Sequence, residues 1–290
     1  IDLDERSNQP FEYKNRYFIV FNGEIYNFKE LRYDLEKLGY SFETSSDTEV
    51  LIACYDAYQE SMLKYLDGMF AFSIYDELEN LVFIARDHLG IKPIYYFINN
   101  ESESFYFSSE LKSLFNFNQV KREIDPNAIG EFLFNGWLYE PDTGFKNVKK
   151  IFPGSFMKIH IESNKIEHLK YFDVKNENSL KKLVKNKSIE KLIDDSIKLQ
   201  CNSDVPLGAF FSGGVDSTVI ANNVKDVKCL SAKYSKDYLL SGGVGDDSYY
   251  TNIIKDKLDL EVFGVELEDD DYTLKRLKSI VRKNEELNSD

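Results

Sequence analysis

The chain has 290 residues and a formal net charge of −14, and 42% of its side chains are hydrophobic. This length allows two packed domains, and the hydrophobic content excludes a disordered chain. Because the acidic charge is spread along the whole length, we expect neither nucleic acid nor an anionic membrane as the main partner.

The composition also limits the compartment and the bound metals. No hydrophobic run approaches the ~18 residues of a membrane helix, and the first residues do not form a signal peptide, so a cytoplasmic protein is expected. Cys54, Cys201 and Cys229 are scattered in hydrophobic segments, which predicts neither disulfides nor a zinc site. The chain starts at Ile1, in what reads as the end of a strand, and we expect it to be a fragment.

The first part of the chain combines hydrophobic strands with amphipathic helices. The pattern predicts a strand at residues 17–21 and helices at residues 28–38 and 47–58. Further strands are expected at residues 69–75, 81–86, 94–97 and 104–107 and, after a helix that starts at Asp125 and Pro126, at residues 155–161 and 166–172. Helices around mostly antiparallel strands predict an α+β domain of layered sheets.

Two polar clusters interrupt this pattern. Residues 22–27, NGEIYN, directly follow the first strand, and residues 45–49, SSDTE, open the second helix. From spacing alone, a turn and an acidic helix cap explain these clusters at least as well as a binding site does.

The remaining sequence alternates strands and helices. Residues 176–187 are the least hydrophobic run, so we place the domain boundary near residue 175 and expect domains at residues 1–175 and 176–290. Beyond the boundary we expect strands at residues 207–211, 227–233 and 260–267. We also expect four helices: one that ends near Leu199, one that starts at Ser217, and two at residues 247–258 and 269–281. This order predicts a parallel α/β sheet with a nucleotide at the carboxyl ends of its strands. The run GGVGDD at residues 242–247 follows no completed strand and is interpreted as a flexible connection.

The most specific segment is residues 212–217, SGGVDS, between a strand that we expect to be buried and a helix. Gly213 and Gly214 permit a tight turn that aims backbone N–H groups at an anion, and the helix N-terminus adds its positive dipole end. Ser212 and Ser217 can add hydroxyl donors. Asp216 has the wrong sign for phosphate, so its carboxylate suggests a bridging Mg²⁺. The simpler interpretation is an ordinary turn with capping side chains.

Residues 212–217 resemble the pyrophosphate-binding loop of the ATP pyrophosphatases, and residues 203–217 resemble the start of the synthetase domain of glutamine-dependent asparagine synthetases. Four earlier blocks resemble successive parts of a class II glutamine amidotransferase domain: NGEIYN at residues 22–27, SDTEV at 46–50, DGMFAFSIYD at 67–76 and RDHLGIKPIYY at 86–96. The resemblance implies an Ntn-hydrolase-like amidotransferase domain followed by an incomplete synthetase domain, truncated at both ends.

The resemblance assigns roles in the first domain residue by residue. Asn22 and Gly23 match the oxyanion hole, and Glu24 and Asp47 match the carboxylates that hold the α-amino group of glutamine. The family's nucleophile is an N-terminal cysteine, which this chain lacks because it starts at Ile1. Cys54 lies among hydrophobic helix residues and is no substitute, so the chain as given should release no glutamate from glutamine.

In the second domain, the resemblance places the phosphates of ATP on Ser212, Gly213, Gly214, Val215, Asp216 and Ser217, with Mg²⁺ on Asp216. The backbone at Phe210 and near Lys233 would contact adenine. The implied reaction is asparagine synthesis from aspartate, glutamine and ATP through a β-aspartyl adenylate, and we also expect a homodimer.

Two other functions stay open at this point. The chain could come from an amidotransferase for another carboxylate, such as a sugar acid in surface-polysaccharide synthesis. It could also be a non-catalytic remnant that binds ATP or glutamine without turnover.

Overall fold

The computed structural model describes residues 5–175, 188–203, 205–224, 227–233, 248–266 and 274–284. Its contacts divide the chain into two compact units, Ile1–Lys185 with Asn284–Asp290 and Asn186–Lys283, which are described separately. The predicted linker at residues 176–187 and the glycine-rich run at residues 242–247 lie outside the described residues. The boundary near residue 175 stays a prediction.

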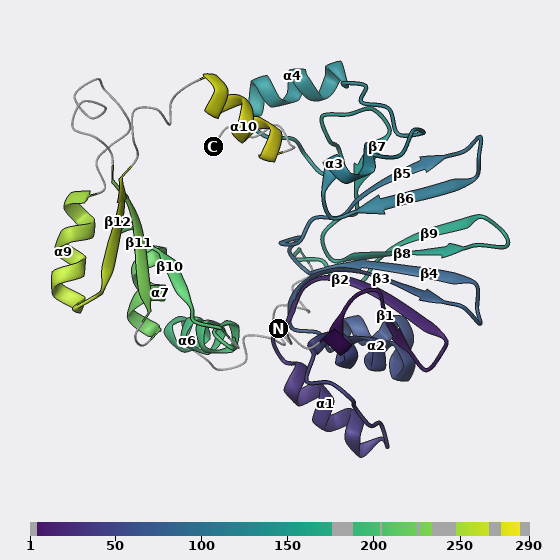
Figure 1. Ribbon diagram of the computed structural model, residues 1–290, viewed down its shortest axis with the longest axis horizontal. Coiled ribbons are helices and arrows are strands. Elements are labelled where there is room, and N and C mark those ends of the chain that lie inside the picture. Colours follow the sequence, from purple (N-terminus) through teal and green to yellow (C-terminus); the bar gives the residue numbers. More distant parts are fainter. Residues whose placement is uncertain are drawn as a thin grey trace. The chain divides into compact units, whose positions relative to one another are not determined.

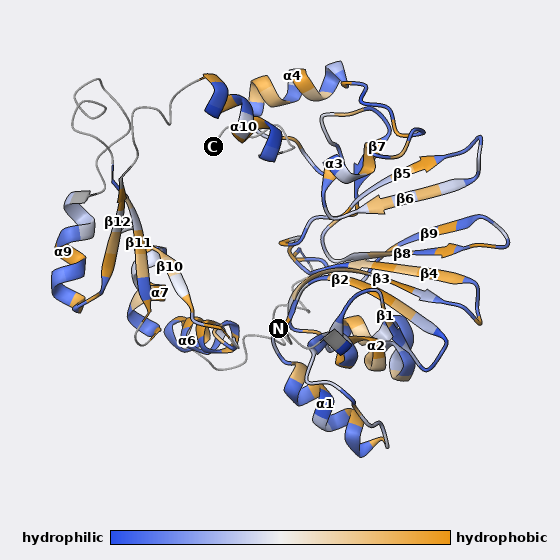
Figure 2. Cartoon of the chain, in the orientation of Figure 1, coloured by the Kyte–Doolittle hydropathy of each residue, from blue (hydrophilic) through white to orange (hydrophobic). Residues whose placement is uncertain are grey.

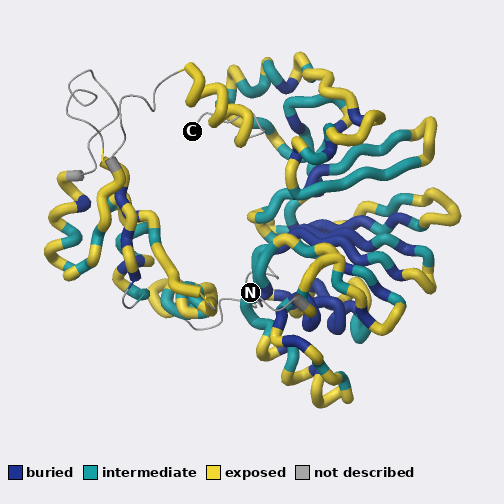
Figure 3. Tube along the Cα trace, in the orientation of Figure 1, coloured by how far each residue is buried: buried dark blue, intermediate teal, exposed yellow. Residues whose placement is uncertain are grey.

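The first unit is built on a six-stranded sheet in which all neighbouring strands are antiparallel (Figure 1). The strand order is β1-β2-β3-β4-β8-β9. The bounds are Phe11–Tyr13 for β1, Tyr17–Ile25 for β2, Gly68–Asp76 for β3, Leu81–Arg86 for β4, Ser155–His160 for β8 and Lys165–Lys170 for β9. Figure 3 shows that buried residues concentrate in its central strands and in the adjacent helix α2.

A second, three-stranded sheet packs on one face of the first. Its order is β6-β5-β7, with β5 at Tyr95–Asn99, β6 at Ser104–Ser108 and β7 at Val148–Lys150. Alternate residues of β3 and β4 face opposite sides: Phe72 and Phe83 belong to the cluster under the helices, whereas Ala71 and Ile84 belong to the cluster between the sheets. Both faces of these strands are therefore buried, which explains their nearly continuous hydrophobic sequence (Figure 2).

Helices complete the layers of the first unit. Helices α1 at Phe28–Lys37 and α2 at Asp47–Tyr58 cover the free face of the larger sheet, and α3 at Leu111–Leu114 packs on the smaller sheet. Helix α4, at Pro126–Asn135, starts at the predicted Asp125 cap and ends at Gly136, whose φ is 81°. Two short 3₁₀ helices lie at Glu5–Ser7 and Gln59–Lys64. The α+β architecture of layered sheets and helices is confirmed.

The second unit contains the predicted parallel sheet, with strand order β10-β11-β12. The strands lie at Gly208–Phe210, Lys228–Lys233 and Val262–Glu266, and the helices α6, α7, α9 and α10 lie at Ile189–Gln200, Val215–Asn223, Ser248–Leu258 and Leu274–Asn284. Phe211, Ala221, Val227 and Cys229 form its small core. None of the helices that the structure describes is long and hydrophobic enough to cross a membrane.

Two sequence interpretations of the second unit were wrong in detail. The strand before the SGGVDS segment is not buried: Phe210 is 88% exposed, on a face of the described sheet where its partner Leu230 and the adjacent Phe263 are exposed as well, and Phe211 instead enters the core. The following helix begins at Val215, two residues before the predicted Ser217, so Asp216 lies in its first turn.

Phe83 is the centre of the aromatic core in the first unit, and its removal tests the packing directly. Its ring lies 5.1 Å from Tyr55, 5.3 Å from Phe156 and 6.0 Å from Phe72, measured between ring centroids. Phe83→Ala should lower the free energy of unfolding by about 3–5 kcal/mol, because the cavity cannot close around these rings. Urea denaturation measures this, with the 70% exposed Leu78→Ala as control, which should change stability by less than about 0.5 kcal/mol. Equal effects of the two substitutions would contradict the packing.

Candidate functional site

The NGEI segment lies inside strand β2 and not in a turn after it. Strand β2 continues to Ile25, and its register with β3 pairs Gly23 with Phe70 and Ile25 with Gly68. The turn predicted from this segment was therefore wrong. The two strands approach so closely that a Cβ on Gly23 would lie 2.1 Å from the Met69 carbonyl oxygen. Glycine at this position is thus required by the neighbouring backbone.

Asp47 connects this strand to the start of helix α2. Ser46 caps the helix by accepting a hydrogen bond from the Thr48 N–H at 3.1 Å, and Asp47 follows in the first turn. The Ile25 N–H donates to Asp47 Oδ2 at 3.0 Å. This bond brings Asp47 beside the residue that follows Glu24 in the sequence, so the two polar clusters form one site.

The electrostatics of this site favour a cationic ligand. Burial raises the pKa of Asp47, the hydrogen bond from Ile25 lowers it, and the negative charge of Glu24 raises it further. The charge of Asp47, which burial and Glu24 disfavour, is stabilised when a positive group lies beside it. An ammonium group satisfies this requirement and can also donate hydrogen bonds to both carboxylates.

Glu49 holds the segment before α2, a role that the sequence interpretation, which treated it only as part of a helix cap, did not predict. Its carboxylate accepts from the N–H groups of Glu43 and Thr44 at 2.9 and 2.7 Å and from the Thr44 hydroxyl at 2.6 Å. Glu49 thereby fixes the segment that leads to Ser46 and Asp47. The spacing S-x-x-E from Ser46 to Glu49 is that of a capping box, and it was the sequence signal from which a structural role of Glu49 could have been predicted. In a capping box the Glu would accept from the Ser46 N–H, whereas Glu49 accepts from Glu43 and Thr44.

A cavity of about 310 Å³ lies beside Asn22. Polar groups in its lining come from Gln9, Asn22, Ser73, Ser108 and Ser109, and hydrophobic residues of both sheets close it. Asn22 itself is exposed. The structure thus brings Asn22, Gly23, Glu24 and Asp47 to one end of β2, with open space on the Asn22 side.

Cys54 lies within helix α2 and is only 1% exposed. Burial raises the pKa of its thiol to about 12. A protonated thiol in the hydrophobic core cannot act as the nucleophile, so the sequence interpretation of Cys54 as a core residue is confirmed.

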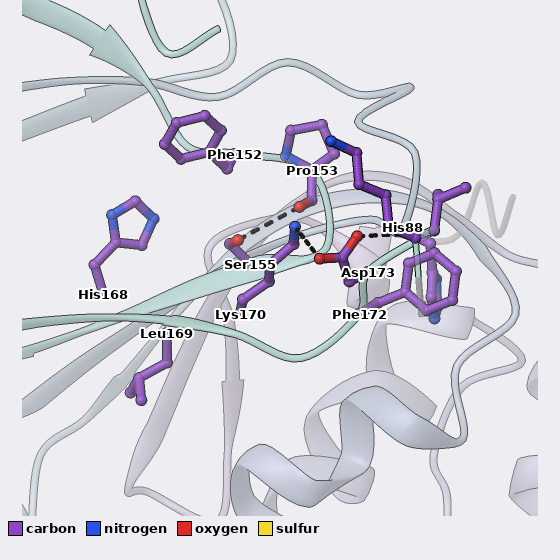
Figure 4. Close-up of a pocket in the computed structure, with 11 residues that line it drawn as sticks. His88, Phe152, Pro153, Ser155, His168, Leu169, Lys170, Phe172 and Asp173 are labelled. Atoms are coloured by element: carbon purple, nitrogen blue, oxygen red, sulfur yellow. Dashed lines mark hydrogen bonds and ion pairs between the residues drawn. The ribbon is translucent and has the colours of Figure 1, made fainter. Parts of the chain in front are cut away.

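A larger cavity, of about 500 Å³, lies along β8 and β9 and contains none of the predicted site residues (Figure 4). Phe152 and His168 line one end, and His88 and Phe172 line the other, while Lys170 and Asp173 form an ion pair of 3.0 Å between them. Burial lowers the pKa values of both His88 and His168, which favours their neutral forms. We assign no part of the predicted chemistry to this cavity.

The SGGVDS segment of the second unit forms a loop between β10 and α7. Gly214 is the N-cap residue of α7, and its N–H lies 3.4 Å from Ser212 Oγ. The Ser212 and Ser217 hydroxyl oxygens are 3.4 Å apart, and the Ser217 hydroxyl donates to the Gly214 carbonyl at 3.1 Å. Hydroxyls and the helix N-terminus are therefore gathered at one point, as an anion site requires.

Gly213 has a φ of 74° and lies against the backbone of α9. A Cβ at this position would come within 2.8 Å of the Thr251 nitrogen. Both the backbone conformation and the close approach therefore select glycine, and it is the approach to the α9 backbone that an ordinary exposed turn would lack.

Phe210 is the last residue of β10, and Lys233 is the last residue of the neighbouring strand β11. Because these strands are parallel, both residues lie at the carboxyl ends of the strands, as this loop does. The Lys233 side chain lies over Gly264 of β12. A Cβ added to Gly264 would lie only 2.1 Å from the Lys233 Cε. Asp216 is exposed in the first turn of α7. No group of three histidine, cysteine or acidic side chains that could hold a metal occurs in the described ranges, so Asp216 is a single candidate ligand.

Comparison with known proteins gives matches to both units. Residues 1–172 match a family model described as glutamine amidotransferase domain, and residues 188–286 match one described as asparagine synthase. Asparagine synthetase [glutamine-hydrolyzing] 1 of Bacillus subtilis is 42% identical over 228 residues, which cover 77% of this chain and 35% of the relative.

Two further relatives carry similar names. Asparagine synthetase [glutamine-hydrolyzing] 3 of Bacillus subtilis is 37% identical over 81% of this chain and 39% of its own length. A putative asparagine synthetase [glutamine-hydrolyzing] 2 of Methanocaldococcus jannaschii is 31% identical over 88% of this chain and 52% of its own. The chain thus spans about a third to a half of the length of these relatives.

The raised pKa of Asp47 predicts that this carboxylate destabilises the ligand-free fold. A carboxyl whose pKa is higher in the folded state binds its proton more tightly there, so stability falls as the pH rises through that pKa. Asp47→Asn keeps an oxygen for the Ile25 N–H and removes the charge. The variant should therefore melt higher than the wild type at pH 7, and the difference should shrink as the pH is lowered toward the ordinary aspartate value of about 4. A variant that melts lower than the wild type at pH 7 would contradict the assigned cause.

Proposed function

The chain belongs to the glutamine-dependent asparagine synthetase family, and from this premise we propose that it takes part in asparagine synthesis from aspartate, glutamine and ATP. The observation that carries the proposal is the hydrogen bond from the Ile25 N–H to Asp47 Oδ2, which joins the two polar clusters into one amino-acid site.

In the first unit, Glu24 and Asp47 bind the α-amino group of glutamine. Both are acidic, and they lie close enough for Glu24 to raise the pKa of Asp47. When a nucleophile attacks the side-chain amide, its carbonyl oxygen becomes negative, and the Asn22 amide and the Gly23 N–H stabilise it. As the nucleophile we propose the family's N-terminal cysteine.

In the second unit, the SGGVDS loop binds the polyphosphate of ATP. Its serine hydroxyls, the N-terminus of α7 and the Gly213 backbone supply donors and no opposing charge other than Asp216. Asp216 would hold Mg²⁺, because a carboxylate oxygen is a hard ligand. A bound Mg²⁺ neutralises charge on the phosphates. Phe210 and Lys233 contact the adenine end through the strand termini.

The proposed chemistry in the second unit has two steps. A β-carboxylate oxygen of aspartate attacks the α-phosphorus of ATP, and pyrophosphate leaves with the electrons of the broken phosphorus–oxygen bond. Ammonia released from glutamine then attacks the activated carbonyl carbon, loses a proton, and displaces AMP to give asparagine. We place this reaction in the cytoplasm and expect a homodimer, and both of these stay predictions.

Asp216→Asn in the full-length protein tests the metal assignment. The substitution keeps the size of the side chain and removes the charge that would face the cation. Pyrophosphate release from ATP and aspartate should fall by at least ~100-fold, while glutamine hydrolysis and the ligand-free melting temperature stay unchanged. Gly213→Val should abolish the same reaction and also lower the melting temperature, because its Cβ meets the Thr251 backbone.

Asp256→Asn, on the exposed side of α9, is the matched control and should leave pyrophosphate release unchanged. Unchanged release in Asp216→Asn would show that Asp216 holds no metal.

A further inference from the structure

Asp87 is a buried carboxylate whose partners are backbone groups. It is 1% exposed, and its two oxygens accept from four N–H groups. Oδ1 accepts from Leu89 and Ile91 at 3.1 and 3.0 Å, and Oδ2 accepts from Lys92 and Phe70 at 2.9 and 3.2 Å. Three of these donors belong to the turn that follows β4, whereas Phe70 belongs to β3.

Arg86 holds the carbonyl groups of the same turn. Its guanidinium donates to the carbonyl oxygens of Gly90 and Lys92 at 2.7 and 2.8 Å. The Asp87 carboxylate binds the N–H groups of the turn, and the Arg86 guanidinium binds its carbonyl groups, so the turn is held in one conformation. Asp87 is therefore fixed in position, and it anchors Phe70 through their hydrogen bond.

This anchor acts where strand pairing stops. The ladder between β3 and β4 ends at the pair of Ala71 with Arg86. Beyond it, the Asp87 N–H donates to the Phe70 carbonyl at 2.8 Å, and the Asp87 side chain accepts from the Phe70 N–H. Asp87 therefore replaces the missing strand along one edge of β3 at Phe70.

The opposite edge of β3 at this point carries Gly23. Gly23 pairs with Phe70, and a Cβ on Gly23 would lie 2.8 Å from the Phe70 Cα. No space separates the two backbones, so the position of Phe70 sets the position of Gly23. A shift of about 1 Å in a catalytic group can cost on the order of 100-fold in rate, so such a contact matters for an oxyanion hole.

We propose that Asp87 is a positioning residue for the oxyanion hole, acting through Phe70 on Gly23 and Asn22. The role rests on the proposed function, because it assumes that Asn22 and Gly23 meet the side-chain carbonyl of glutamine. Asp87 does not touch the substrate. It fixes the strand that the substrate contacts.

Binding of two amino acids to the 290-residue chain separates positioning from general stability. L-Glutamine has the side-chain carbonyl that Asn22 and Gly23 would meet, and L-norvaline has the same α-amino and carboxylate groups without it. In Asp87→Asn, the side-chain NH₂ group replaces one carboxylate oxygen and faces backbone N–H groups that it cannot accept from. The substitution should therefore weaken the hold on Phe70. Glutamine affinity, measured by NMR titration, should fall by about tenfold, whereas norvaline affinity should change by less than about twofold.

Asp76→Asn is the matched control. Asp76 lies at the other end of β3, is also fully buried, and accepts from the backbone N–H groups of Leu78 and Glu79 and, at 2.8 Å, from the Arg16 guanidinium. It should lower the melting temperature and leave the ratio of glutamine to norvaline affinity unchanged.

The outcomes distinguish the two proposals. A wild-type chain that does not prefer glutamine to norvaline would contradict the glutamine site itself. A wild-type preference that survives in Asp87→Asn would overturn the positioning role alone. If Asp87→Asn does not fold, Asp87→Glu replaces it in the same comparison. If neither Asp87→Asn nor Asp87→Glu folds while Asp76→Asn does, Asp87 is needed for the stability of the whole domain. That result would also overturn the positioning role.

Discussion

The close pairing of β2 with β3 at Gly23 and Phe70 is the contact on which the first unit depends. It requires a residue without a Cβ on β2, and it carries Asn22 and Glu24 on either side of that residue. Helix α2 is then tied to the same strand end by Asp47 through Ile25. A sheet buried on both faces cannot easily adjust, so these polar groups have one fixed arrangement.

The second unit shows the same close approach of two backbones at a glycine. Gly213 permits the SGGVDS loop to lie against the backbone of α9, just as Gly23 permits β2 to lie against β3. In each case a glycine brings backbone close to backbone and leaves polar groups beside it. The difference lies in charge: two carboxylates gather in the first unit, whereas hydroxyls and a helix N-terminus gather in the second.

Much of this arrangement could be predicted from local sequence. Helix α2 begins and ends as expected, because Ser46 gives a clear cap, and alternating strands and helices gave the parallel sheet. The continuation of β2 through Gly23 could not be predicted, since polar residues and a glycine resemble a turn until β3 is known to lie beside them. The short strands β1 and β7 were missed because three residues carry no periodic pattern, and the exposure of Phe210 depends on which face of the sheet other elements cover.

The central claim is that Glu24 and Asp47 form one site for the amino group of an amino acid. Calorimetric titration of the chain with L-glutamine and with N-acetyl-L-glutamine tests it most directly, because acetylation removes the positive charge and leaves the side chain intact. Glutamine should bind, and its affinity should fall as the pH drops through the raised pKa of Asp47, whereas N-acetyl-glutamine should not bind. Equal affinity for the two ligands would contradict the claim.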